Sequence, residues 1–591
     1  MAKLTPLAKG IITIVVVSAV GTALYVNKDK IAPKAKRQAS VVPPKVELPE
    51  AQDPKNPGPI PSGDLPPPGC PDKPEVRFLH WAWNAQMGLM LATGNKQAAQ
   101  GSLMCKHGVN LVLTREDMVD NMQAQLVAFA EALKAGEKHP KTGAHFVAIM
   151  GDGSAAFLKG VNDRLKKLGP DYIAAVVGSA GYSRGEDKFM GPPEWKKNPQ
   201  AARGGVVAGV LRDGDWNIAL KWLGDNGIAN NPDEKTYDPD ALNWIAASDY
   251  IDAGQKYVSG YCEERKNVKT SKPEKACVQG VVTWTPGDVT VAKEKGGLIS
   301  IVSTKEYRSQ MPNVVIGNKK WMAENRALVK GMLSAIFDAG DEIKASDEAL
   351  RKAAGISAVV YKEKDGAYWY KYFTVQTEKD KQGLMVELGG SSVNNLADNL
   401  QLFGLAEGST SLFAATYTVF GNVVKQQYPE YVPDFYPVAQ ILDSSYVKEL
   451  AGVGAFGTQA DLPKFEPAAR VQEVVSRKAW SIEFESGKAA FTRKAEAVLE
   501  QLLADLVIAG GTLVEIHGHT DSVGGMEKNQ ALSEERAFVV KKWLEGKSPV
   551  NFPQGRVKVF AHGQEQPLES NNTSAGRAKN RRVEIVMGTS G

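Results

Sequence analysis

The chain has 591 residues, of which 43% are hydrophobic and 23% are charged, and its formal net charge is +4 at pH 7. This length is too great for a single hydrophobic core and predicts several domains. The composition excludes a wholly disordered chain and a polytopic membrane protein, and the nearly neutral charge gives no reason to expect a nucleic-acid partner.

The N-terminus joins a short basic stretch, 1–9, to the apolar run GIITIVVVSAVGTALYV at 10–26. This run has the minimum length of a membrane-spanning helix, so we predict an anchor in the inner membrane. The alternative is a signal peptide that is cleaved near Gly21-Thr22-Ala23. More basic residues follow the run than precede it, which alone would place the N-terminus outside, but the downstream domains favour the opposite orientation.

A Pro-rich segment with few large apolar residues occupies 27–74. Such a segment cannot form a core, so we predict a semi-stiff, polyproline-like linker. About 40 residues at roughly 3.1 Å each would reach on the order of 100 Å, which suits a spacer that lifts a domain off a membrane. A generic flexible linker would differ from this only in its stiffness.

From 75 to 460 short β-rich runs alternate with amphipathic helical patterns. The predicted strands, several of which end in Gly-rich turns, are 76–83, 109–114, 145–153, 171–185, 204–214 and 280–288. Helical periodicity covers 117–134, 216–223 and 319–343. This alternation predicts an α/β fold with largely parallel sheets, which bind ligands at the carboxyl ends of their strands.

The stretch GVVTWTPGDVTVAKEKGG, followed by NVVIGNKKWMAENRALVKGMLSAIFDAGDEI, resembles the second half of type II periplasmic solute-binding proteins of the nitrate/sulfonate/taurine branch. The resemblance implies two α/β lobes, a hinge and a small organic or anionic solute between the lobes. The region of roughly 230–279 is an insertion relative to the family pattern.

Candidate solute-binding residues follow from their positions at strand ends: Trp81, Trp83, Ser154, Ser179, Ser183, Gly205 and Trp284. Aromatic side chains can form a wall of a ligand site, and turn hydroxyls and backbone amides can receive an anion. The competing interpretation is core or hinge packing for each Trp, and capping or turn formation for each Ser.

The four cysteines, Cys70, Cys105, Cys262 and Cys277, form no C-x-x-C pair. Cys262 and Cys277 flank a polar, Lys-rich segment, which predicts an exposed hairpin closed by a disulfide. A Cys70–Cys105 bond then follows by elimination and would fix the end of the linker to the first lobe. Such bonds require an oxidising compartment. The alternative is four unpaired thiols.

The C-terminal region predicts a compact α+β domain at 478–588, after a linker at 461–477. Its expected strands lie at 480–491, 512–525, 556–567 and 580–587, in the order βαβαββ. Helices are expected at 492–506 and at 532–546, the latter opened by a capping box at Ser533.

Five blocks in this region resemble the OmpA-like peptidoglycan-binding family over the whole domain. They are GHTDSVG (518–524), Asn529, LSEERA (532–537), HGQEQP (562–567) and NNTSAGRAKNRRVEI (571–585). The resemblance implies recognition of the diaminopimelate in the peptide stem of peptidoglycan. Because the apolar run at 10–26 contains no Asp, Glu, Lys, Arg or His, the chain is not expected to be an ion-conducting stator subunit.

Carried onto this sequence, the family pattern assigns Asp521 to the ammonium and Arg536 to the carboxylate of diaminopimelate. Each contact would be a charge-assisted hydrogen bond. Thr520 and Asn529 would position the ligand and its loop. The alternative is a simple Asp521–Arg536 salt bridge. Gly487 departs from the polar residue that relatives often carry, which puts contacts there in doubt.

Metal, cofactor and catalytic sites are not predicted. His517 and His519 alternate on one strand, but the sequence offers no evident third ligand, so packing is favoured over a metal site. The sequence contains no H-E-x-x-H or Walker motif, and an enzyme is not expected.

These features together predict an anchored protein of the Gram-negative periplasm that binds peptidoglycan and captures a small solute. The alternative from a different class is a structural or signalling tether between the inner membrane and the cell wall, whose central domain binds protein instead of solute.

Overall fold

The computed structural model describes residues 60, 64–212, 214–452, 460–485 and 487–590. The predicted membrane anchor and most of the predicted linker lie outside these ranges. Among the described residues, no helix is long and apolar enough to cross a membrane.

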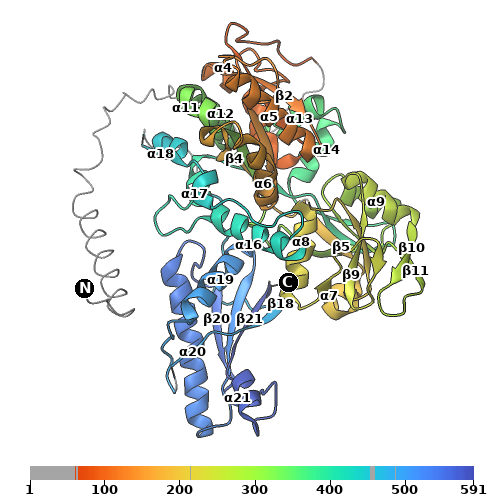
Figure 1. Ribbon diagram of the computed structural model, residues 1–591, viewed down its shortest axis with the longest axis vertical. Coiled ribbons are helices and arrows are strands. Elements are labelled where there is room, and N and C mark those ends of the chain that lie inside the picture. Colours follow the sequence, from red (N-terminus) through yellow and green to blue (C-terminus); the bar gives the residue numbers. More distant parts are fainter. Residues whose placement is uncertain (1–59, 61–63, 213, 453–459, 486, 591) are drawn as a thin grey trace, which may run out of the picture. The chain divides into compact units, whose positions relative to one another are not determined.

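The first lobe of the central region is built on a six-stranded sheet in the order β17-β4-β14-β3-β1-β2 (Figure 1). Its strands are β1 (Glu75–His80), β2 (Asn110–Arg115), β3 (Phe146–Met150), β4 (Ala174–Ser183), β14 (Pro312–Asn318) and β17 (Ser391–Val393). The strands β3, β4 and β14 are buried along their whole length, as expected where helices cover both faces of a sheet.

Helices of the first lobe include α3 (Met87–Thr93), α5 (Val119–Lys134), α6 (Ser154–Leu165), α11 (Lys319–Glu324), α12 (Arg326–Ala345), α13 (Asp347–Tyr361) and α14 (Gly366–Phe373). The single helix expected at 319–343 is two helices, because the backbone at Asn325 leaves the helical conformation (φ −118°, ψ 38°). The Asn325 side-chain amide donates to the Trp321 carbonyl at 2.8 Å, which satisfies the end of α11.

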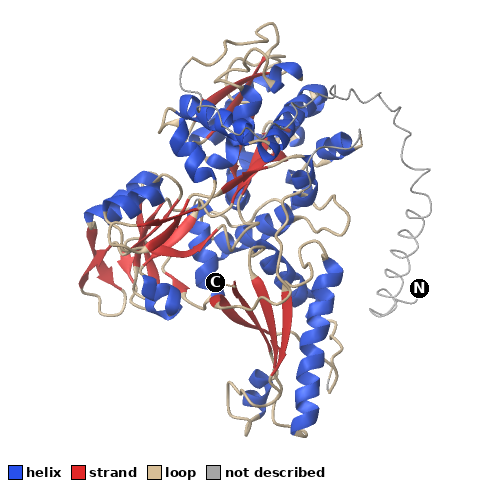
Figure 2. Cartoon of the chain, turned by 180° about the vertical axis from the view of Figure 1, so that it is seen from behind, coloured by secondary structure: helices blue, strands red, loops and turns tan. Residues whose placement is uncertain are grey.

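The second lobe contains another six-stranded sheet, in the order β13-β5-β12-β6-β9-β7. Figure 2 shows its strands in red, at the left of the view. Its strands are β5 (Lys188–Gly191), β6 (Val206–Gly209), β7 (Ala229–Asn230), β9 (Ala241–Ala246), β12 (Gly280–Thr283) and β13 (Ile299–Ser303). The helices α8 (Gly214–Asp225), α9 (Tyr250–Ser259) and α10 (Gly287–Glu294) belong to this lobe.

Both sheets are mixed, whereas the sequence predicted largely parallel sheets. β1 is parallel to β2 and β3, and β6 is parallel to β9 and β12. However, β14 is antiparallel to β3 and β4, and β5 is antiparallel to β12 and β13. The chain crosses between the lobes from β4 to β5 and returns from β13 to β14. A strand that enters a sheet from the other lobe runs against its neighbours, and hydrophobic periodicity does not report strand direction.

The inserted region forms the predicted disulfide-closed hairpin. β10 (Cys262–Asn267) and β11 (Pro273–Cys277) pair in antiparallel register, with Cys262 directly opposite Cys277. The two cysteines form a disulfide with a Cα–Cα distance of 4.0 Å. The predicted pairing is therefore confirmed.

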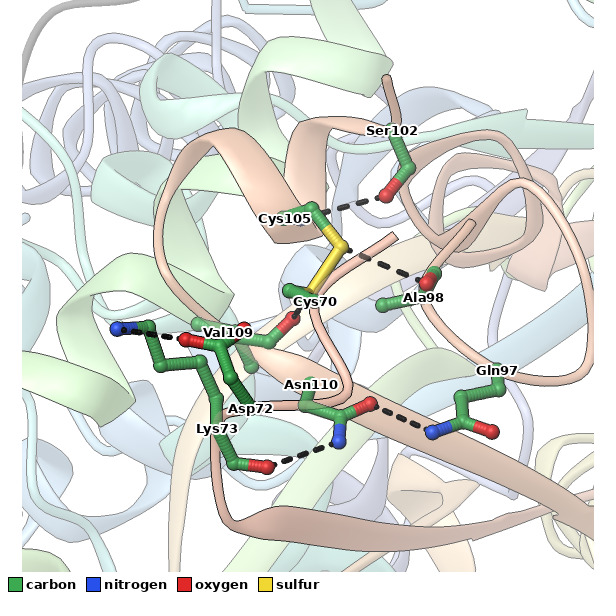
Figure 3. The surroundings of a disulfide bond; sticks show 9 residues. All are labelled: Cys70, Asp72, Lys73, Gln97, Ala98, Ser102, Cys105, Val109 and Asn110. Carbon is green, nitrogen blue, oxygen red and sulfur yellow. Dashed lines mark hydrogen bonds and ion pairs between the residues drawn. A yellow bond between two sulfur atoms is a disulfide. The ribbon is translucent and has the colours of Figure 1, made fainter. Parts of the chain in front are cut away.

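The second predicted disulfide, Cys70–Cys105, is also present and joins the end of the Pro-rich segment to the first lobe (Figure 3). Backbone hydrogen bonds strengthen this junction, since Gly69 N donates to Ala98 O at 2.9 Å and Gln100 N donates to Pro67 O at 2.8 Å. The last part of the predicted linker, from 64 to 74, is therefore packed against the lobe, as the Cys70–Cys105 pairing predicts.

The C-terminal domain has a four-stranded sheet in the order β18-β21-β19-β20. Its strands are β18 (Glu473–Trp480), β19 (Leu513–Gly518), β20 (Val557–Ala561) and β21 (Val583–Thr589), and its helices are α19 (Ala495–Ile508), α20 (Met526–Lys547) and α21 (Ser574–Asn580). Figure 1 shows α20 running alongside this sheet. The predicted α+β domain is confirmed, with the short helix α21 as an addition. Its first strand, β18, lies at Glu473–Trp480 and not at the predicted 480–491, so the strand begins within the segment predicted as a linker at 461–477.

The start of α20 was predicted wrongly. The helix begins at Met526, after Gly525, so Ser533 lies inside it and does not cap it. The Ser533 hydroxyl donates to the Gln530 carbonyl at 2.7 Å and accepts the Gly563 amide at 3.0 Å. A Ser followed by acidic residues is equally compatible with a helix interior, provided that the hydroxyl has a partner.

Candidate functional site

The turn after β19 carries two of the predicted peptidoglycan-binding residues, Thr520 and Asp521. Both are buried, with 4% and 7% of their surface exposed. The turn is fixed by the Thr520 amide, which donates to Gly563 O at 2.8 Å, and by the Val523 amide, which donates to Asp521 Oδ1 at 2.9 Å. The Thr520 hydroxyl is buried and has no hydrogen-bond partner among the described residues.

The helix α20 carries the other two, Asn529 and Arg536, which are seven residues apart and therefore on the same face of the helix. The Asn529 amide donates to the Asp521 carbonyl at 3.1 Å and to Gln564 Oε1 at 2.8 Å. Asn529 thus fastens the turn that holds Asp521 to the segment after β20.

Asp521 forms its ion pair with Arg581, a residue to which the sequence interpretation gave no role. The Arg581 Nη1 atom lies 2.6 Å from Asp521 Oδ2. Arg536 instead donates through Nε to the Lys488 carbonyl at 3.2 Å, and its guanidinium lies 5.0 Å from the centre of the Phe484 ring. Arg581 lies in the segment 571–585 that resembles the OmpA-like family. Only its contact with Asp521 identifies it as a residue of the candidate site.

Arg536 and Arg581 line a cavity of about 570 Å³. Its other lining residues are Ala479, Trp480, Ser481, Ile482, Glu483, Phe484, His519, Leu568, Ala578, Lys579 and Arg582. Basic side chains therefore outnumber acidic ones in the lining. Burial lowers the pKa of the Arg536 guanidinium, and the neighbouring positive charge of Arg581 lowers it further. A ligand carboxylate would relieve both effects.

Three histidines stack beside this cavity. The His517 and His562 rings lie 5.1 Å apart, the His519 and His562 rings lie 4.8 Å apart, and both pairs are nearly parallel. The third histidine, His562, was not connected with the other two from the sequence, because it lies on the neighbouring chain segment. Among the described residues, no group of His, Cys, Asp and Glu side chains is arranged to hold a metal ion. Burial, followed by the charge of Arg582, lowers the pKa of His519 to about 4.

In the central region, the predicted residues Trp81 and Trp284 meet across the two lobes. Trp81 follows β1 of the first lobe and Trp284 follows β12 of the second, and their rings stack at 6.4 Å. Tyr250 packs on the other side of Trp284 at 4.1 Å. The two lobes are therefore in contact at the strand ends.

Trp83 and Ser183 lie where the chain crosses between the lobes. The Trp83 indole Nε1 donates to Asp187 Oδ2 at 3.2 Å. The Ser183 hydroxyl is hydrogen-bonded to Thr304 Oγ1 at 2.6 Å and accepts the Asp187 amide at 3.1 Å. Both residues therefore position the segment that contains Asp187.

The other predicted solute-binding residues have local structural partners. The Ser154 hydroxyl donates to the Gly151 carbonyl, and the Ser179 hydroxyl donates to the Gly181 carbonyl at 3.1 Å. Gly205 is packed beneath Trp195, and a Cβ atom at this position would lie 2.6 Å from the indole ring. The structure does not bring these three residues together with the tryptophans.

Two buried acidic residues in the crossing segment, Glu186 and Asp187, were not identified from the sequence. Neither side chain is exposed to solvent. Burial raises the pKa of the Glu186 carboxyl well above its usual range, and the Asp187 charge raises it further. Burial also raises the pKa of Asp187, to about 6. Sequence could not reveal them, because the pair stands in a polar turn where acidic residues are ordinarily exposed.

Comparison with known proteins agrees with this division of the chain. Residues 483–581 match the OmpA family, so the C-terminal domain is an OmpA-family domain. The chain is 37% identical over 117 residues to outer membrane porin F of Pseudomonas aeruginosa, covering 20% of this chain and 33% of the porin. It is 34% identical over 129 residues to outer membrane protein A of Bordetella avium, covering 22% of this chain and 63% of that protein. The chain thus spans less than two thirds of either relative.

Two solved structures are each similar to part of the chain. The cell wall anchor of the T6SS from Pseudomonas aeruginosa is 25% identical, with a TM-score of 0.18, over 20% of this chain and 87% of that chain. The periplasmic aliphatic sulphonate binding protein SsuA from Escherichia coli is 12% identical, with a TM-score of 0.40, over 68% of this chain and 97% of that chain.

Proposed function

We propose that this protein binds peptidoglycan through its C-terminal domain and captures a small solute between the lobes of its central domain, 75–460. The observation that carries the first half is the cavity beside β19, which Arg536 and Arg581 line and where Arg581 is ion-paired with Asp521. A zwitterion such as diaminopimelate has a carboxylate for Arg536 and an ammonium group for Asp521, so both of its charges would be neutralised.

Asp521 already has a partner in Arg581, and the ammonium group would share or replace that partner. Arg536 is different, because no carboxylate of the described residues lies within ion-pair distance of it. The carboxylate of the ligand would therefore gain the stronger new contact. Thr520 would add its unpartnered hydroxyl and Asn529 would hold the turn in place.

The proposed location is the periplasm of a Gram-negative bacterium, with the apolar run at 10–26 as the inner-membrane anchor. The two disulfides support an oxidising compartment, since such bonds do not persist in a reducing cytosol. The Pro-rich segment up to residue 63 would then separate the anchor from the first lobe.

Solute capture is supported by the contact between the lobes. Trp81 and Trp284 come from different lobes, so a molecule held there would contact both. Such a molecule would favour the closed arrangement of the lobes. A structural tether with a protein-binding central domain is the second candidate, and it predicts no effect of small molecules on the central domain.

The test of cell-wall binding is sedimentation of the purified protein with peptidoglycan sacculi. We expect the protein to pellet with sacculi whose stem peptides contain diaminopimelate. It should remain in solution with sacculi whose stems contain lysine, because lysine lacks the second carboxylate. Equal pelleting with both, or with neither, would contradict recognition of diaminopimelate.

A further inference from the structure

Four carboxylates gather where the two lobes meet: Asp152, Glu186, Asp187 and Asp215. Asp152 follows β3 of the first lobe, and Asp215 lies in the first turn of α8 in the second lobe. The Asp215 side chain is hydrogen-bonded to that of Asp187. Asp152 lies against the start of the same helix, since a Cβ atom at Gly214 would be 3.1 Å from its Oδ1. The cluster therefore joins both lobes to the crossing segment.

Glu186 and Asp187 each keep one carboxylate oxygen without a hydrogen-bond partner among the described residues. These atoms, Glu186 Oε1 and Asp187 Oδ1, are both inaccessible to solvent. Their second oxygens bind neutral donors, the Ser391 hydroxyl and the Trp83 indole. Burying a charged oxygen without a partner is costly, which agrees with the raised pKa values of both carboxyls.

The basic side chains of this region already have acidic partners. Lys188 Nζ lies 2.5 Å from Asp288 Oδ2, and Arg115 Nη1 lies 2.9 Å from Glu363 Oε2. Neither of them forms an ion pair with Glu186 or Asp187, and neither is available to a second anion without losing its own partner. Among the described residues, no basic side chain is therefore paired with Glu186 or Asp187.

Other buried polar atoms on both sides of the lobe contact also lack a partner among the described residues. On the first lobe these are both amide atoms of Asn84, whose neighbour Trp83 binds Asp187, and the Nε1 atom of Trp81. On the second lobe they are the Nε1 atom of Trp284 and the hydroxyl of Thr285. Each of these side chains is at least nine-tenths buried. Buried polar groups in native proteins nearly always have a partner, so their concentration indicates a bound molecule.

We propose that the surface between the lobes binds a small organic cation, an amine or quaternary ammonium compound, through the carboxylates of Glu186 and Asp187. The indoles of Trp81 and Trp284 would provide the aromatic wall that such cations favour. Asn84 and Thr285 would bind the polar remainder of the molecule. This inference rests on the proposed solute capture and replaces the anionic solute that the sequence allowed, since an anion would meet two acidic side chains that have no basic partner among the described residues.

The experiment is isothermal titration calorimetry of the purified full chain at pH 7.5. The cationic probes are choline, ethanolamine and putrescine. The neutral control is 3,3-dimethylbutan-1-ol, which has the shape of choline without its charge, and the anionic control is ethanesulfonate. We expect at least one cation to bind and both controls to show no binding.

The variants Glu186→Gln and Asp187→Asn should each weaken binding of that cation about tenfold or more, because each removes one charge partner. The exposed carboxylate of Glu407 offers a matched control, and Glu407→Gln should leave the affinity unchanged. Far-UV circular dichroism verifies that each variant is folded. If one variant does not fold, the other still tests the site.

The outcomes separate the two proposals. Binding of ethanesulfonate or the neutral alcohol without binding of any cation would overturn the cationic site and leave solute capture intact. Cation binding that survives both substitutions would also overturn it, because the site would then lie elsewhere. Failure of all five probes would count against solute capture itself, whereas cell-wall binding is measured separately by sedimentation.

Discussion

Arg581 is ion-paired with Asp521 at 2.6 Å, although 60 residues separate them in the chain. This pair joins the turn after β19 to the end of α21, and it shields the negative charge of Asp521. Arg536, in the same cavity, donates to a backbone carbonyl and lies over an aromatic ring, and no carboxylate of the described residues is ion-paired with it. The carboxylate of a bound zwitterion would therefore contact Arg536, which has no ion-pair partner among the described residues. Its ammonium group would contact Asp521, which is already paired with Arg581.

The first prediction is that Arg536→Gln and Asp521→Asn each weaken binding to diaminopimelate-containing sacculi. Each change removes one charge-assisted contact, for which about 1.5–3 kcal/mol, or roughly ten- to a hundredfold in affinity, is typical. Sedimentation of the full chain over a range of sacculus concentrations measures the effect. Lys542→Gln, an exposed residue of the same helix, serves as the charge-matched control and should bind like the parent. Unchanged binding by both folded variants would show that the site lies elsewhere.

The second prediction concerns the Cys70–Cys105 disulfide. Replacing both residues by Ser should release the segment 64–74, because the bond closes a loop with a sequence separation of 35 residues. The expected loss in free energy of unfolding of the central domain is roughly 2–4 kcal/mol. Limited proteolysis with endoproteinase Asp-N should then cleave faster before Asp72, an exposed residue of this segment. The Cys262→Ser/Cys277→Ser variant is the control, since it opens a separate hairpin and should not change cleavage before Asp72.

The third prediction is a loss of stability of the central domain in mild acid. His80 is fully buried, and burial lowers its pKa to about 4, against about 6.5 in an unfolded chain. Between about pH 4 and pH 6.5 the imidazole of His80 is therefore protonated in the unfolded chain and neutral in the folded protein. The contribution of His80 is therefore complete above pH 6.5 and is lost as pH falls toward 4, by about 3 kcal/mol in total.

Denaturant unfolding of the parent and of His80→Gln between pH 7.5 and 4.5 measures this contribution. The parent should lose more stability than the variant over this range, so that the two curves converge in acid. If the stabilities of the parent and the variant change in parallel with pH, the pKa of His80 is not lowered as predicted.

The sequence predicted the α/β and α+β regions and both disulfides, because hydrophobic periodicity and cysteine spacing are local signals. Strand direction in the mixed sheets was not predictable, since it depends on how the chain crosses between the lobes. Site residues that depend on contacts between distant parts of the chain were not predictable either. Asp521 and Arg536 stand in recognisable blocks, whereas Arg581 and the Glu186–Asp187 pair acquire meaning only from contacts distant in sequence or from burial.

The last prediction concerns the lobe contact made by Trp284. Replacing Trp284 by Ala removes its ring contacts with Trp81 and Tyr250. The contact with Trp81 is the one that joins the two lobes, because Tyr250 belongs to the second lobe itself. We expect the lobes to separate more often, so the radius of gyration from small-angle scattering should increase. Trp284→Phe keeps an aromatic ring and should give an intermediate value.

Loss of a large buried side chain also destabilises a protein, typically by about 3–5 kcal/mol, so the control must share that cost. Trp321→Ala provides it, because Trp321 is buried among Phe129, His145 and Phe146 inside the first lobe. This variant should lose stability without any change in the radius of gyration. A similar radius for the parent, Trp284→Ala and Trp321→Ala would show that the indole pair does not hold the lobes together. An increase confined to Trp284→Ala would instead identify the pair as the contact that a captured solute has to reinforce.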